Sequence, residues 1–173
     1  MGLIIVDTRE HKKERERICK QFDQLGISYE RKMLNVGDYM DTDNPHVVIE
    51  RKKDLHEICG NVTYDHERFK RELIRARENN VKIILLCEHG KDIETLEDVF
   101  FWENPRSQPS RWVMRDGHPC KIAQSKKAVT GRQLYRCLCT IRDRYGIDIL
   151  FCDKSETGKR IIELLEKYDG CEH

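Results

Sequence analysis

The sequence predicts an α/β fold in which a β-sheet is covered by helices on both sides. Short apolar runs of strand length alternate along the chain with charged segments whose apolar residues recur at helical spacing. With 173 residues, 38% hydrophobic and 36% charged, the chain is long enough for one domain with a core. Its ten glycines and four prolines argue against collagen-like, linker-rich and disordered classes. We therefore expect a single domain over residues 1–173.

The chain opens with a predicted strand and a predicted amphipathic helix. Residues 3–6 form an apolar run that is closed by Asp7. The next segment is highly charged, and its apolar residues recur at i, i+4 and i+7: Ile18, Phe22 and Leu25. Gly26 follows directly, as is typical of the residue that ends a helix.

A hairpin, a second helix and a buried strand are predicted next. Residues 27–33 and 46–52 have strand character, and a polar turn at residues 41–45 separates them. A helix is predicted over residues 65–79, and an apolar strand over residues 81–87 follows it. Two sets of residues lie on different faces of this helix: apolar Phe69, Leu73 and Ala76, and basic Arg68, Arg71 and Arg75.

The last part of the chain is predicted to run helix, strand, helix. The first helix ends at Gly146 and carries apolar residues at helical spacing: Leu134, Leu138, Ile141 and Tyr145. A strand over residues 147–152 follows, and Ser155 is predicted to cap a final helix that carries Ile161, Leu165 and Tyr168. Residues 101–127 fit the alternation least well, because aromatic, basic and proline residues are interleaved there, and we interpret them as an insertion.

The net charge of +1 hides an uneven distribution of charge. Residues 85–104 carry six acidic residues against Lys91 alone, a local charge of −5. Residues 105–144 carry ten basic residues against Asp116 and Asp143, a local charge of +8. Such asymmetry makes nucleic acid or another polyanion a candidate partner, and a solvated basic face is the alternative.

The cysteines argue against a secreted disulfide scaffold. Eight are present, but the sequence has no Cys-x-x-Cys pair, leader or long apolar segment. Cys120, Cys137 and Cys139 do not have the spacing of the usual structural zinc sites. We expect an intracellular, reduced protein with no membrane association: cytoplasmic, or nuclear in a eukaryote.

The most informative pattern is an acid followed, after a spacer, by an acid and a lysine two residues apart. Side chains alternate along a strand, so Glu50 and Lys52 are expected to face one pocket while Arg51 points away. Asp38, which follows Gly37, is expected to meet Glu50 across the hairpin. Neighbouring carboxylates repel each other unless a cation lies between them, and their oxygens suit Mg²⁺ or Mn²⁺. A nearby lysine is suited to orienting or activating a water.

Several motifs stand in order along the first half of the chain: Val6-Asp7-Thr8-Arg9-Glu10, Val36-Gly37-Asp38-Tyr39, Ile49-Glu50-Arg51-Lys52, Gly60-Asn61 and Arg68-Phe69-x-Arg71-Glu72. They resemble the nuclease domain of the XPF-type structure-specific endonucleases, within the P-D-(D/E)-x-K superfamily. The resemblance is strong over residues 3–88 and rests on element order alone over residues 125–168. It implies a restriction-endonuclease-like central mixed β-sheet flanked by helices.

The resemblance also implies a function, which is metal-dependent endonucleolytic hydrolysis of DNA at flaps, forks or other branched structures, as used in repair and recombination. The implied partners are branched DNA and a second copy of the chain, and we expect this homodimer to use the apolar faces of the last two helices. No nucleotide cofactor is implied, because Gly158-Lys159 lacks the earlier glycine of a phosphate-cradling loop. No helix-hairpin-helix domain is recognised in these residues, so DNA binding is expected from this domain, a second copy or a partner.

The resemblance assigns roles to particular residues. Asp38, Glu50 and the Arg51 carbonyl would bind Mg²⁺ or Mn²⁺, Asp7 would lie beside the metal, and Lys52 would position or activate the attacking water. Arg9, Glu10 and the Arg51 side chain would support this catalytic set. The family usually places an aspartate where this chain has His56, so the third acid is Glu57 or Asp54, with Glu57 favoured. The expected DNA-binding residues are Arg68, Arg71, Arg75, Arg111 and Trp112.

Other interpretations remain open. The acids and the lysine are alternatively a surface salt-bridge cluster, and Asp7 is alternatively an acid at a helix N-terminus. The family contains members with decayed sites, so a non-catalytic DNA-binding or partner-recruiting module is the main alternative function. The retained Asp38, Glu50 and Lys52 argue against decay. The same chemistry would also serve a nuclease that acts on RNA.

Overall fold

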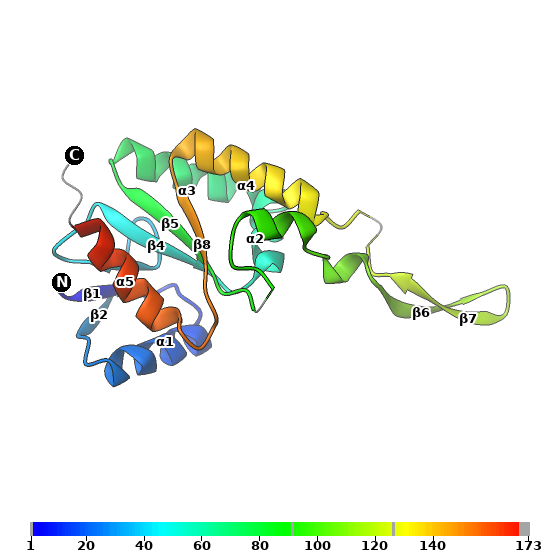
Figure 1. The fold of residues 1–173 in the computed structure, drawn as a ribbon, viewed down its shortest axis with the longest axis horizontal. Helices are drawn as coiled ribbons and strands as arrows, with labels where there is room; N and C mark the ends of the chain where they lie inside the picture. The colour runs from blue at the N-terminus through cyan, green and yellow to red at the C-terminus, as the bar shows by residue number, and fades with distance from the viewer. Residues whose placement is uncertain (1, 91, 126, 170–173) are drawn as a thin grey trace.

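The computed structural model describes residues 2–90, 92–125 and 127–169. Its main sheet contains β1 (Ile4–Asp7), β2 (Tyr29–Lys32), β3 (Tyr39–Asp41), β4 (Val47–Lys52), β5 (Lys82–Cys87) and β8 (Asp148–Phe151). The helices are α1 (Lys12–Gln24), α2 (Leu55–Thr63), α3 (His66–Glu78), α4 (Gly131–Tyr145) and α5 (Thr157–Asp169). The strand order is β2-β1-β3-β4-β5-β8 (Figure 1). The predicted central mixed sheet with flanking helices is confirmed.

The predicted hairpin between residues 27–33 and 46–52 is wrong. β2 lies at the edge of the sheet, where it pairs in parallel with β1, and β3 pairs in antiparallel with both β1 and β4. The hairpin is therefore formed by β3 and β4. With only three residues, β3 is too short to show an alternating apolar pattern. Arg31 and Lys32 of β2 are exposed, as is usual for an edge strand.

Helices cover both faces of the sheet and create two cores (Figure 1). α2, α3 and α4 bury Phe69, Leu73 and Leu138 against one face. α1 and α5 bury Phe22 and Ile161 against the other face. The apolar faces of the last two helices are thus packed inside the molecule, on opposite sides of the sheet, so the surface that we expected for a homodimer is not exposed. The homodimer itself stays a prediction.

The ends of the last two helices differ in how well the sequence predicts them. Thr130 and Gln133 form a capping box at the start of α4, and Gly146 ends it with a φ of 65°. The predicted Ser155 cap of α5 is wrong, because the Ser155 hydroxyl donates instead to Asp153 Oδ1 at 2.6 Å. The first turn of α5 is held by α1, since the Gly158 N–H donates to Gln21 Oε1 at 2.6 Å.

The predicted insertion at residues 101–127 contains the end of one 3₁₀ helix, η1 (Glu97–Phe101), and all of a second, η2 (Pro105–Ser107). They lead into the antiparallel strands β6 (Pro109–Arg115) and β7 (His118–Ala123), which together are called the arm below. The arm extends away from the main sheet (Figure 1). Lys126, within the predicted insertion, lies outside the described residues.

Two further expectations concern cysteines and membranes. The seven cysteines that the structure describes are free thiols, and Cys171 lies outside the described residues. Among the described helices, none is long and apolar enough to cross a membrane.

Candidate active site

A polar cleft of about 690 Å³ opens where three strands of the sheet meet. β1 and β4 both end at this edge, and β3 begins there, because it runs antiparallel to its two neighbours. The four residues predicted to be catalytic all line the cleft: Asp7, Asp38, Glu50 and Lys52. The structure therefore brings together residues that are spread over 46 positions of the sequence.

Strand alternation places the residues of the Glu-Arg-Lys motif, as predicted. Glu50 and Lys52 lie on the α2–α3 side of β4, and the Lys52 ammonium is 5.5 Å from the centre of the Phe69 ring of α3. Arg51 points to the opposite side of the sheet, where it meets Glu10 and Glu88. One strand thus supplies the cleft with a carboxylate and an ammonium group, while its arginine binds acids on the other face.

Asp38 is held directly opposite this motif. Gly37, with a φ of +74°, brings the chain so close to β4 that a Cβ there would lie 2.8 Å from Val48 Cβ. The Asp38 N–H donates to the Ile49 carbonyl at 2.8 Å, and Asp38 Oδ2 accepts the Arg51 N–H at 2.8 Å. Burial, with the nearby carboxylates of Glu50 and Glu10, raises the pKa of Asp38 well above its usual value.

Glu50 and Lys52 form a buried ion pair. Lys52 Nζ donates to Glu50 Oε1 at 2.6 Å, and both side chains are almost completely buried. Burial disfavours the charged form of Lys52, but the Glu50 carboxylate outweighs it, so the pKa of Lys52 is raised. Burial and the Glu72 and Glu10 carboxylates raise the pKa of Glu50 despite the attraction of Lys52. The raised pKa of Lys52 favours its ammonium form at neutral pH, beside the Glu50 carboxylate.

Asp7 lies at the end of β1, next to Asp38, and its side chain is only 2% exposed. Asp7 Oδ1 accepts the Arg9 N–H at 2.9 Å, and the Arg9 guanidinium binds the same carboxylate. Since α1 begins five residues later, at Lys12, Asp7 holds a turn rather than the N-terminus of the helix. Arg9, which was expected to support the catalytic set, binds the Asp7 carboxylate and donates to the Leu34 carbonyl.

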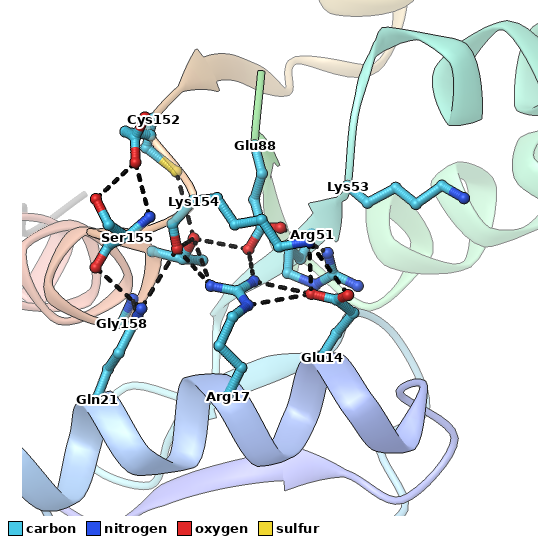
Figure 2. Close-up of polar contacts among 12 residues, drawn as sticks. Glu14, Arg17, Gln21, Arg51, Lys53, Glu88, Cys152, Lys154, Ser155 and Gly158 are labelled. Carbon is cyan, nitrogen blue, oxygen red and sulfur yellow. Dashed lines mark hydrogen bonds and ion pairs between the residues drawn. The ribbon is translucent and has the colours of Figure 1, made fainter. Parts of the chain in front are cut away.

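A buried charge network supports the motif from the other side of the sheet (Figure 2). Arg51 donates to Glu10 at 2.8 Å and to Glu88 at 3.1 Å. Glu88 also binds Arg17 of α1 and accepts the Thr157 hydroxyl at 2.6 Å. The pairing of Glu10 with the hairpin agrees with its expected supporting position.

The sequence analysis did not identify Glu88, Arg17 or Thr157. The one signal for Glu88 was its place directly after the buried strand β5, at the edge of the sheet where the cleft opens.

Two further acids lie on the rim of the cleft. Glu57 lines it and accepts the Lys53 N–H at 2.9 Å, whereas Asp54 is the N-cap of α2 and accepts the Glu57 N–H at 2.8 Å. Glu57 is therefore the better placed of the two candidates for the third acid. Glu72 of α3 also lines the cleft and accepts the Gly37 N–H at 3.4 Å. It belongs to the Arg-Phe-x-Arg-Glu motif but was not predicted as a site residue.

The residues predicted to bind DNA fall into two groups. Arg68, Arg71 and Arg75 are exposed on α3 and line the cleft. Arg75 also donates to the Asn35 carbonyl at 2.9 Å, which fixes it against the loop before Gly37. Arg111 and Trp112 lie on the arm instead and do not line the cleft. The structure thus separates residues that we expected to form one continuous track.

The oxygens of Asp38 and Glu50 fit a hard divalent cation. Glu50 is buried and Asp38 is partly buried, and burial is the main cause of the raised pKa of each, which for Glu50 persists despite its ion pair with Lys52. Among the described residues, no three His, Cys, Asp or Glu side chains already form a metal site. Two carboxylates suit Mg²⁺, which keeps several waters and is bound by only one or two carboxylates.

Comparisons with known proteins agree with this geometry. Two similar solved structures are XPF from Aeropyrum pernix and the same protein in complex with DNA, each with a TM-score of 0.61 and 19% identity. The matches cover 98% and 97% of this chain, and it spans 66% and 65% of theirs. This likeness shows the fold. No curated protein matches the sequence. The family model described as the ERCC4 domain matches residues 6–165, which confirms the expected resemblance: the chain belongs to the ERCC4 domain family.

Proposed function

We propose that this chain is a metal-dependent endonuclease that hydrolyses phosphodiester bonds of DNA. The observation that carries the proposal is the convergence of Asp38, Glu50 and Lys52 in one cleft whose rim bears the arginines of α3. Two neighbouring acids, of which Glu50 is buried, and a buried lysine line an open, polar cleft and are not needed to hold the sheet together, because apolar residues would stabilise the sheet better. The relative XPF has been solved in complex with DNA, which supports DNA as the substrate.

Each residue has a distinct task in the proposed reaction. Asp38, Glu50 and the Arg51 carbonyl would hold Mg²⁺ or Mn²⁺, which supplies Lewis-acid activation of water and of the scissile phosphate. Lys52, a fixed cation, would orient the attacking water and offset the charge that develops on the phosphate. Asp7, which is paired with the Arg9 guanidinium, and Glu57 would complete the acidic surroundings.

DNA binding is proposed to run along α3. Arg68, Arg71 and Arg75 recur at i, i+3 and i+7, so they present one cationic edge to the phosphates that flank the cut. Substrates with flaps, forks or other branches are proposed from the family resemblance. A non-catalytic DNA-binding module remains the alternative, and it predicts binding without cleavage.

The decisive experiment compares cleavage by variants of the cleft with matched surface variants. Labelled flap, fork, single-stranded and duplex DNA, with RNA counterparts, are incubated with Mg²⁺, Mn²⁺ or a chelator. We expect Asp38→Asn, Glu50→Gln and Lys52→Ala each to reduce the rate by at least about 100-fold. Glu78→Gln and Lys20→Ala remove similar exposed charges elsewhere and serve as controls.

Cleavage that survives Asp38→Asn and Lys52→Ala would refute the proposed site. Binding without cleavage under every metal condition would favour the non-catalytic module. Preferential cutting of the RNA counterparts would replace DNA as the substrate. Thermal unfolding of each variant separates a lost site from a lost fold, which matters most for Glu50→Gln because it leaves Lys52 buried without its partner.

A further inference from the structure

The arm is a second exposed surface whose residues differ from those of the cleft. Asp116 and Gly117, with φ of 49° and 79°, form a tight two-residue turn between β6 and β7. No described residue of the arm belongs to either core. Trp112 is nevertheless 62% exposed and Met114 69% exposed on it. Large apolar side chains on a projecting hairpin do not stabilise the fold, so they indicate a binding surface.

The register of the arm sorts its side chains onto two faces. Trp112 pairs with Lys121 and Met114 with Pro119, so these four residues share one face. The Lys121 ammonium lies 5.1 Å from the centre of the Trp112 ring. Arg111 and Arg115 pair with Ile122 and His118 on the opposite face. Arg111 and Trp112, which we expected to act together, therefore point in opposite directions.

The base of the arm is held by a buried polar residue. Asn104 Nδ2 donates to the Val129 carbonyl at 2.9 Å, and Asn104 Oδ1 accepts the Arg106 N–H at 3.0 Å. The Ser125 N–H donates to the Arg106 carbonyl at 3.0 Å and joins the two sides of the base. The arm is thus attached at a defined position on the domain, as a binding element requires.

The charge of the arm selects the kind of partner. Residues 104–125 contain Arg106, Arg111, Arg115 and Lys121 but a single acid, Asp116, at the turn. A cationic hairpin that also exposes an indole matches a polyanion with free aromatic faces, which is a nucleic acid with unpaired bases. Paired bases are already stacked inside a duplex and do not offer their faces to Trp112.

We propose that the arm binds a single-stranded segment of the nucleic-acid substrate, with a base stacked on Trp112 and phosphates bound by Lys121. As an account of substrate choice, this inference rests on the proposed nuclease function: the cleft would cut while the arm holds an unpaired strand.

The test measures binding separately from cleavage. Fluorescence anisotropy of labelled single-stranded and blunt duplex oligonucleotides is recorded with the full chain in the presence of a chelator, so no cutting is required. We expect Trp112→Ala to weaken single-strand binding by about 10-fold or more, because stacking on one aromatic ring contributes that much. Trp112→Phe should restore most of the affinity, and duplex affinity should change less than about 2-fold. Tyr64→Ala, which removes another exposed aromatic, is the control.

Results that refute the role of the arm differ from results that refute the nuclease proposal. Single-strand affinity that is unchanged in Trp112→Ala, or equally reduced in Tyr64→Ala, would overturn the role of the arm even if the protein cuts DNA. Absence of cleavage would refute the nuclease proposal even if Trp112 binds single strands. A dimer in light scattering that Trp112→Ala dissociates, with binding to DNA unchanged, would show that the arm contacts a second copy and would overturn the inference.

Discussion

At the scale of single residues, the cleft depends on a backbone position that only glycine fills well. Gly37 combines a positive φ with a close approach to Val48, and the next residue is the proposed metal ligand Asp38. Gly26 has a nearly equal φ of +69°, but a Cβ there would meet no atom within 4 Å. Substitution at either glycine introduces backbone strain, but only substitution at Gly37 also introduces steric overlap.

We predict that Gly37→Ala damages both stability and the site, whereas Gly26→Ala affects stability alone. A left-handed conformation costs an alanine roughly 1–2 kcal/mol. The overlap of the new Cβ with Val48 adds about 1–3 kcal/mol at position 37. Urea denaturation measures the loss in the free energy of unfolding, and titration with Mn²⁺ measures metal affinity at the cleft. Equal free energies of unfolding for the two variants, or an unchanged Mn²⁺ affinity in Gly37→Ala, would contradict this account.

The sequence predicted the direction of individual side chains correctly where a rule that depends only on neighbouring residues applies. The period of two along a strand placed Glu50 and Lys52 on one side and Arg51 on the other. It gave no partner for Arg51, because Glu88 becomes its neighbour only when β5 pairs beside β4. Contacts created by strand pairing depend on the whole sheet and have no signal in the local sequence.

At the scale of elements, Glu88 joins four parts of the fold. It follows β5, binds Arg51 of β4 and Arg17 of α1, and accepts the hydroxyl of Thr157 at the start of α5 (Figure 2). Its side chain is completely buried. The acid is thus the shared anchor between the strand that carries the motif and the two helices on the opposite face.

We predict that Glu88→Ala lowers the free energy of unfolding by about 3 kcal/mol, because it removes the buried carboxylate that two guanidinium groups share and leaves Arg51 with Glu10 alone and Arg17 with Glu14 alone. Glu88→Gln retains an acceptor and should cost less. Glu78→Ala, an exposed acid at the end of α3, should change stability by less than about 0.5 kcal/mol. Chemical denaturation of the three variants checks this order, and a neutral effect of Glu88→Ala would contradict it.

The arm is predicted to be dispensable for folding. Replacing residues 109–123 by a short Gly-Ser turn should change the free energy of unfolding by less than about 1 kcal/mol, because none of its described residues enters a core. Duplex binding should remain, and single-strand binding should fall below the level of Trp112→Ala, because Lys121 is lost as well. Loss of the cooperative unfolding transition would show that the arm is part of the folding unit.

Element-scale prediction from the sequence depended on the length of each pattern. The long amphipathic helices α1, α3, α4 and α5 were predicted because a 3.6-residue period over 13–15 residues is unmistakable. The three-residue β3 was missed, so the hairpin was assigned to β2 instead. The arm was interpreted as part of an insertion, because the proline, glycine and arginine residues around Asp116-Gly117 obscured the sequence pattern of a hairpin turn.

At the scale of the whole molecule, charge is segregated rather than absent. The net charge is +1, yet the cleft rim bears Arg68, Arg71 and Arg75, and the arm bears a second positive group. Surfaces of this kind attract phosphates locally even when the total charge is near zero. The sequence predicted a local charge of +8 over residues 105–144, which contain the arm but not the arginines of α3, and the separation into two surfaces follows from how the arm leaves the fold (Figure 1).

The last prediction concerns the salt dependence of duplex DNA binding, which should be steep although the protein is nearly neutral. Each phosphate contact contributes about 0.9 to the slope of log K against log salt, so Arg75→Ala should reduce the slope by about 1. Arg77→Ala is the matched control, because Arg77 lies on the same helix but packs 5.8 Å from the centre of the Tyr145 ring, away from the cleft. Anisotropy titrations from low to physiological salt give both slopes. If Arg77→Ala lowers the slope as much as Arg75→Ala, the helix acts through its total charge, and the cationic edge of the cleft is not the path of the DNA.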